Sequence, residues 1–218
     1  LGIPAEPLFR SSYGVPFLYT INNHSNIICI MRNYLLLLLI SFCTSIGAQN
    51  ATALYEQGKK LYDEKKYAEA FPKLKAAAEK GHKKAQYRLG RCYDKGYGVE
   101  EDNNQAFKWY KKAADQEYAK AQYQLGKCYK DGKGVEKDKK KAFELFLKAA
   151  AEENADAEMA VGKAYMKGKG TAADEAKAKK YLKRSVNNPK GGAELLKEVR
   201  EEAAAGDEDA KKILTLIK

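Results

Sequence analysis

The chain has few of the side chains on which enzymes most often rely. Of its 218 residues, only two are histidines and four are cysteines. After residue 49 there is a single serine, Ser185, and a single histidine, His82. Nucleophilic catalysis needs a base within hydrogen-bond reach of the nucleophile, and these two residues stand far apart in the chain. One histidine and two distant cysteines cannot supply the four ligands of a zinc site. The sequence therefore predicts no catalytic site, no metal site and no cofactor.

A hydrophobic run long enough to span a membrane is also missing. The longest apolar stretch covers residues 34–42, whereas a spanning helix needs about 20 residues. It follows Met31 and a basic residue and is followed by small residues, which is the order of a secretory signal peptide. We predict a signal peptide at residues 31–48, cleaved near Ala48, and an exported protein that is periplasmic or secreted. Residues 1–30 are interpreted as upstream sequence that is not native to the protein.

Negative charge is scarce relative to positive charge. The chain has 40 Lys and Arg residues against 29 Asp and Glu residues, a formal net charge of +11. A basic excess favours acidic partners, such as acidic protein segments, nucleic acid, or anionic glycans and lipids. Because an exported protein seldom meets nucleic acid, we expect no nucleic-acid partner. Nonspecific binding of polyanions, with an affinity that falls steeply as salt is added, is an alternative.

The sequence is rich, by contrast, in internal repetition. A nine-residue segment that begins at Ala85 returns at Ala121 and again, more loosely, at Ala157, each time 36 residues further on. The second half of the unit returns at the same spacing, over residues 102–114, 138–150 and 174–186. Self-similarity at a fixed period of this size is typical of repeat architectures.

Each unit has the pattern of two helices joined by a glycine loop. Apolar residues recur at helical spacing in both halves, as at Ala85, Leu89 and Tyr93. Between the halves stands a Gly-x-Gly segment, which can supply the positive φ that ends one helix and starts the turn. An aspartate then occupies the N-cap position of the second helix, at Asp102, Asp138 and Asp174. One hairpin alone cannot bury its apolar face, so the hairpins must stack. We predict an all-α fold of stacked antiparallel helix hairpins.

The unit resembles the Sel-one-like repeat, a relative of the tetratricopeptide repeat. The matching pattern, A-x-Y-x-L-G-x-x-Y-x-x-G-x-G-V-x-x-D-x-x-x-A-x-x-W-Y-x-x-A-A, extends over about residues 52–190. This resemblance implies a right-handed α-solenoid. The predicted divisions are a tetratricopeptide-like first repeat at 52–84, Sel-one-like repeats at 85–120 and 121–156, a divergent repeat at 157–190 and capping helices at 191–218.

Two cysteines bear on a possible enzymatic function of such a protein. Some cysteine-rich relatives have been linked to β-lactam binding or hydrolysis, but they carry paired cysteines within each repeat. Here Cys92 and Cys128 are single and occupy the same position of adjacent repeats. Equivalent points on stacked helices lie roughly 9–10 Å apart, while a disulfide needs Cα atoms within about 7 Å. We therefore predict two free thiols. Activity as a β-lactam hydrolase or cell-wall hydrolase is kept as an alternative function.

One face of the first helix in each unit carries a repeated pair of residues. An aromatic residue or methionine is followed four positions later by a cation, and residues at i and i+4 share a helix face. The resemblance implies that these helices line a concave groove. We predict that the groove binds an acidic or extended segment of a protein partner, with cations meeting carboxylates and rings supplying apolar contact. An alternative is that the tyrosines serve packing and the cations are only solvated. The candidate residues are Tyr55 and Lys59, Tyr87 and Arg91, Tyr123 and Lys127, and Met159 and Lys163.

Overall fold

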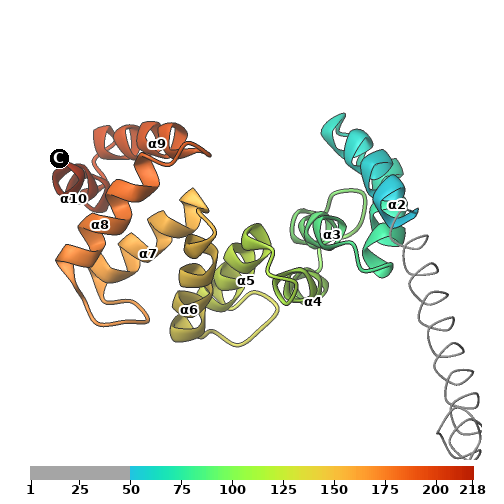
Figure 1. The fold of residues 1–218 in the computed structure, drawn as a ribbon, viewed down its shortest axis with the longest axis horizontal. Helices are drawn as coiled ribbons and strands as arrows, with labels where there is room; N and C mark the ends of the chain where they lie inside the picture. The colour runs from blue at the N-terminus through green and yellow to red at the C-terminus, as the bar shows by residue number, and fades with distance from the viewer. Residues whose placement is uncertain (1–49) are drawn as a thin grey trace, which may run out of the picture. The chain divides into compact units, whose positions relative to one another are not determined.

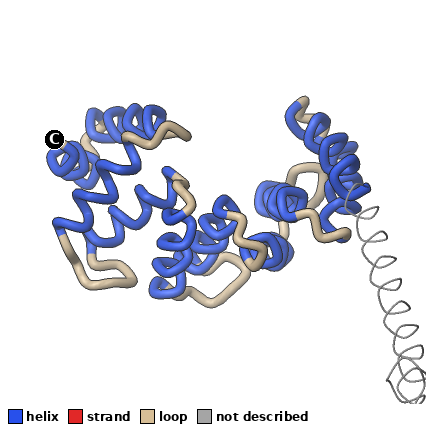
Figure 2. Tube along the Cα trace, in the orientation of Figure 1, coloured by secondary structure: helices blue, strands red, loops and turns tan. Residues whose placement is uncertain are grey.

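The computed structural model describes residues 50–218, and within that range it contains helices, turns and loops but no strand (Figures 1 and 2). The predicted signal peptide at residues 31–48 lies outside the described residues. The prediction of an all-α repeat fold is confirmed. After a helix that includes residues 50–63 come α2 (Tyr67–Glu79), α3 (Lys83–Lys95), α4 (Asn103–Ala114), α5 (Ala119–Asp131), α6 (Lys139–Ala151), α7 (Ala155–Lys167), α8 (Glu175–Val186), α9 (Gly192–Ala204) and α10 (Glu208–Ile217).

The helices pack as hairpins that follow one another in chain order (Figure 1). We call α3, α5 and α7, with the helix over 50–63, the first helices, and α2, α4, α6 and α8 the second helices. Each of α3, α5 and α7 packs against the second helix that follows it and also against the one that precedes it. The hairpin of α9 and α10 packs on α8. Every repeat therefore packs against the repeats next to it in the chain, as in other solenoids.

The predicted helix ends are confirmed in detail. The Oδ1 atom of Asp102 accepts hydrogen bonds from the backbone N–H groups of Asn104 and Gln105, at 2.8 and 3.0 Å. Asp138 caps α6 in the same way, and Asp174 caps α8 through one bond, from the N–H group of Lys177. Three glycines in the left-handed region end the first helices, namely Gly96, Gly132 and Gly168. These signals are local, because they depend on residues within one turn of the helix end.

The second glycine of each loop has a role that its backbone conformation alone does not explain. A Cβ atom added to Gly134, whose φ is +68°, would lie 2.1 Å from the carbonyl oxygen of Asn103 at the start of α4. Gly98 and Gly170 lie equally close to the second helix of the repeat before them. The glycine loop of one repeat thus packs directly on the backbone of the preceding one, which sets the spacing between repeats.

Aromatic pairs also connect consecutive repeats. In each pair, a phenylalanine on a second helix meets a tyrosine on the next first helix edge to face, with ring centroids 5.2–5.6 Å apart. This geometry is one that aromatic rings prefer. The pairs recur every 36 residues, at Phe71 and Tyr93, Phe107 and Tyr129, and Phe143 and Tyr165.

Candidate binding groove

A groove of about 550 Å³ lies along the first helices in the C-terminal half of the array. Its walls come from α5, α6, α7 and α9 and from the two glycine loops that follow α5 and α7. The helix caps and the loop glycines described above hold these elements in place. The apolar part of the lining is formed by Tyr123, Ala142, Phe143, Phe146, Met159, Ala160, Ala164 and Leu195.

Four of the eight candidate residues line this groove together. They are Tyr123 and Lys127 from α5, and Met159 and Lys163 from α7. The two lysines are half-buried, and the Nζ atom of Lys127 lies 5.7 Å from the centre of the Tyr123 ring. Side chains from equivalent positions of two repeats therefore meet at one site.

The apolar members of this set also take part in packing. The Tyr123 ring lies 5.6 Å from that of Phe146, and burial raises the pKa of the Tyr123 phenol. Met159 is buried and packs in a cluster with Leu182 and Ile213. These residues support the core with one side and line the groove with the other, so packing and binding do not exclude each other.

The other four candidate residues do not line the groove. Tyr55 is buried and its ring stacks on that of His82 at 4.4 Å. Tyr87 meets Tyr118 edge to face at 5.4 Å. For these two tyrosines the structure favours a packing role. Lys59 and Arg91 are half-buried on the same helices.

The charge of the groove is strongly positive. Seven lysines line it against three carboxylates. Two of the lysines are ion-paired, Lys130 with Asp131 and Lys167 with Asp209. Burial, followed by repulsion from Lys169, lowers the pKa of Lys167. Across residues 50–218 no ion pair is formed by Lys137, Lys139, Lys163 or Lys169. An anionic group in the groove would relieve the mutual repulsion of these lysines.

Sequence reasoning missed several residues of the groove. Lys137 and Lys169 belong to the glycine loops, and Leu195 and Glu198 come from α9. The repeat pattern did not mark these lysines, because Lys133, at the position equivalent to Lys169, does not line the groove, and Ala173 stands at the position equivalent to Lys137. The α9 residues carried no signal either, since the repeat pattern ends before them.

The two residues considered for catalysis have structural roles. The Nδ1 atom of His82 accepts a hydrogen bond from the N–H group of Ala85 at 3.2 Å and so caps α3. Ser185 is fully buried and its hydroxyl donates to the carbonyl oxygen of Leu182 at 2.8 Å.

Among the described residues there is no group of three or more side chains that could hold a metal ion. None of the helices described is long and apolar enough to cross a membrane.

Helix hairpins repeating every 36 residues, each with a glycine loop, define an α-solenoid of the tetratricopeptide-like class. The chain belongs to the Sel1 repeat family, whose model matches residues 83–118, 119–154 and 155–188. The family boundaries begin two residues before those predicted from the sequence.

Solved structures agree with this assignment. The crystal structure of a Sel1 repeat protein from Oxalobacter formigenes is 31% identical, covers 72% of each chain and has a TM-score of 0.59. A protective antigen of uropathogenic Escherichia coli strains that displays an SLR fold is 30% identical, with a TM-score of 0.62. That match covers 73% of this chain and 39% of the antigen, so the chain spans about two fifths of that protein. No curated protein matches the chain.

Proposed function

We propose that this protein is an exported scaffold, an adaptor or a regulator, that binds a protein partner through the groove and is not an enzyme. The observation that carries the proposal is the set of lysines without ion pairs around an apolar floor. An extended acidic segment would place carboxylates on the lysines and apolar side chains on Tyr123, Met159 and Leu195. Burial of both kinds of group at one site is typical of specific interfaces.

Binding of a defined peptide tests this function. The probe is a fluorescein-labelled peptide of alternating Glu and Leu residues, titrated with the full chain and followed by anisotropy. A peptide of alternating Lys and Leu residues is the control for apolar contact alone. We expect saturable binding of the acidic peptide only. Equal binding of dextran sulfate and the peptide, with the same steep dependence on salt, would mean nonspecific polyanion binding instead.

The exported location depends on the pattern at residues 31–48, which lies outside the described residues. Its test is N-terminal sequencing of the protein recovered from outside the cytoplasm. We expect the first residue close to Gln49. A chain that keeps residues 31–48 and stays in the membrane would contradict signal cleavage.

The enzymatic alternative has a separate test. A β-lactam hydrolase or cell-wall hydrolase would show turnover of a chromogenic cephalosporin or of purified peptidoglycan. We expect no turnover, because His82 and Ser185 are engaged in capping and in a buried hydrogen bond. Turnover that survives purification to homogeneity would contradict the proposed scaffold function.

A further inference from the structure

The repeats meet at three equivalent junctions, each with a buried polar side chain near the start of a first helix. At the first junction this residue is Gln86, of which 5% is exposed. Its Nε2 atom donates to the carbonyl oxygen of Ala78 at 3.1 Å, and its Oε1 atom accepts from Nε2 of Gln116 at 2.7 Å. Both ends of the Gln86 amide are thus satisfied, and the junction is closed.

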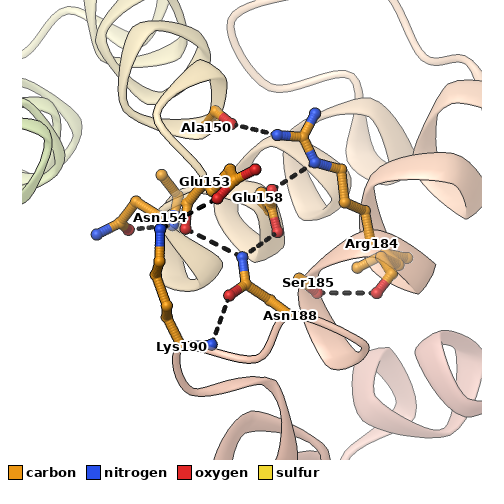
Figure 3. A network of polar contacts seen from close by, with 10 residues as sticks. Ala150, Glu153, Asn154, Glu158, Arg184, Ser185, Asn188 and Lys190 are labelled. Carbon is orange, nitrogen blue, oxygen red and sulfur yellow. Dashed lines mark hydrogen bonds and ion pairs between the residues drawn. The ribbon is translucent and has the colours of Figure 1, made fainter.

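The third junction is closed by a guanidinium group (Figure 3). Here the buried residue is Glu158, whose Oε1 atom is 2.5 Å from Nε of Arg184. This contact is an ion pair without hydrogen-bond geometry at Oε1. The Nη2 atom of Arg184 donates to the carbonyl oxygen of Ala150 at 2.7 Å. Asn188 donates to the other oxygen of Glu158 at 3.1 Å. The guanidinium therefore bridges the buried side chain and a backbone carbonyl of the preceding second helix.

The middle junction has the same acceptors, but no side chain donates to them within the described residues. Gln122 is only 7% exposed, and its Oε1 atom is buried without a hydrogen-bond partner. The carbonyl of Ala114, equivalent to those of Ala78 and Ala150, receives no side-chain donor within the described chain. Glu152 stands where the other junctions have Gln116 and Asn188, and an ionised carboxylate cannot donate. Lys148 stands where Arg184 does, but it is exposed.

An open pocket of about 560 Å³ marks this junction. Gln122 and Ala114 line it together with the carboxylates of Asp115, Glu117 and Glu152 and a single cation, Lys148. Asp115 is paired with Lys111, which leaves Glu117 and Glu152 against Lys148. The pocket is thus locally acidic on a chain whose net charge is +11. A buried acceptor left without a donor is unfavourable, and the acidic rim favours a donor that is also a cation.

We propose that this pocket binds an arginine side chain presented by a partner protein. The third junction supplies the template, because Arg184 already fills the equivalent space with a guanidinium. In the middle junction the guanidinium would donate to Oε1 of Gln122 and to the Ala114 carbonyl, with Glu152 as its counter-ion. A guanidinium has five donors in a planar fork, whereas an ammonium group is a compact, strongly hydrated charge. This geometry selects arginine over lysine.

The test uses the full chain labelled with ¹⁵N and the probe Nα-acetyl-arginine amide. We expect saturable shifts of the Gln122 side-chain amide and of the backbone amides around Ala114 and Glu117. Nα-acetyl-lysine amide, as the matched probe, should bind at least about fivefold more weakly. The variant Gln122→Glu, which copies Glu158, should strengthen binding of the arginine probe about tenfold.

Two further variants separate a binding pocket from a loosely packed junction. Glu152→Gln restores the pair seen between Gln86 and Gln116, so it should close the pocket and abolish the shifts at Gln122. Gln116→Glu should open the first junction and create new probe-dependent shifts at Gln86. The proposal is overturned if the probe does not shift Gln122 in the original chain, or if Glu152→Gln binds it unchanged. Neither result affects the groove between α5 and α7, which is tested with an acidic peptide.

Discussion

The guanidinium of Arg184 on α8 and the carboxylate of Glu158 on α7 form an ion pair within the last repeat, and Glu158 is fully buried. The equivalent residues of the other repeats, Gln86 and Gln122, are neutral. A buried carboxylate requires a partner, because removing one member of a buried pair leaves an uncompensated charge. Arg184 also donates to the Ala150 carbonyl (Figure 3). The guanidinium that pairs with Glu158 therefore also joins the last repeat to the preceding second helix by a hydrogen bond, in addition to apolar packing.

Loss of this pair should weaken the C-terminal half of the array. We expect Arg184→Met to lower the free energy of unfolding by about 2 kcal/mol, because Glu158 stays buried without its partner while the Arg184 side chain is itself 43% exposed. Urea unfolding followed by circular dichroism measures the change. The double variant Arg184→Met with Glu158→Gln should recover most of the loss, since it removes the buried charge. Equal midpoints for the original chain and Arg184→Met would contradict a stabilising role for the pair.

The close approach of the glycine loops predicts an unequal effect of two alanine substitutions. Gly134→Ala should destabilise by about 2 kcal/mol or more, because the new methyl group adds a clash with Asn103 to the backbone strain. Gly81 has a φ of +88° and open space around it, so Gly81→Ala should cost only about 1 kcal/mol. Thermal unfolding of both variants gives the comparison. A larger loss for Gly81→Ala would show that strain, and not repeat spacing, explains these glycines.

Charge reversal tests the groove. The double variant Lys127→Glu with Lys163→Glu should weaken binding of the acidic peptide at least about tenfold, in line with lost charge pairs at an interface. Lys75→Glu with Lys108→Glu is the matched control, because it changes the net charge equally on exposed parts of second helices. Solvent-facing changes usually alter stability by within about 0.5 kcal/mol. If both variants lose the same affinity, general basicity explains the binding.

The two thiols should react slowly while the protein is folded. Cys92 and Cys128 are free and buried, and burial raises their pKa values from 9.0 to about 12 and about 11. Since only the thiolate is the nucleophile, we expect almost no alkylation by iodoacetamide at pH 8. In urea, without a reductant, peptide mapping by mass spectrometry, which distinguishes these two cysteines from Cys29 and Cys43, should show both of them modified. Rapid modification of Cys92 or Cys128 in the folded chain would contradict their burial.

The same pKa shifts predict a loss of stability in alkaline solution. Burial also raises the pKa of Tyr62 from 10.0 to about 12. At these three groups the unfolded state releases its protons first, so the free energy of unfolding is unaffected below about pH 9 and falls as the pH rises towards 12. Urea midpoints measured from pH 8 to pH 11 should show this decline. A constant midpoint over that range would mean that the groups are not buried in solution.

Much of the fold follows from the sequence because its signals are local. The period of 36 residues, the aspartate N-caps and the glycine C-caps depend on residues a few positions apart, and the structure confirms them. A helix end is specified by the side chains of its own first or last turn. The packing of Gly134 on Asn103 could not be read in this way, since it joins two repeats.

The sites were decided by tertiary structure. From the sequence the candidate pairs appear equivalent in four repeats, yet only Tyr123, Lys127, Met159 and Lys163 share the groove, because α9 and two loop lysines complete it there. Likewise, Gln86 and Gln122 are both glutamines and occupy the same position of their repeats. One is satisfied and the other is not, because the side chain that reaches it comes from 30 residues further along the chain, Gln116 in one case and Glu152 in the other. Local sequence determines each helix and its ends, whereas the donors and charges that meet at the junctions are set by how the helices pack on one another.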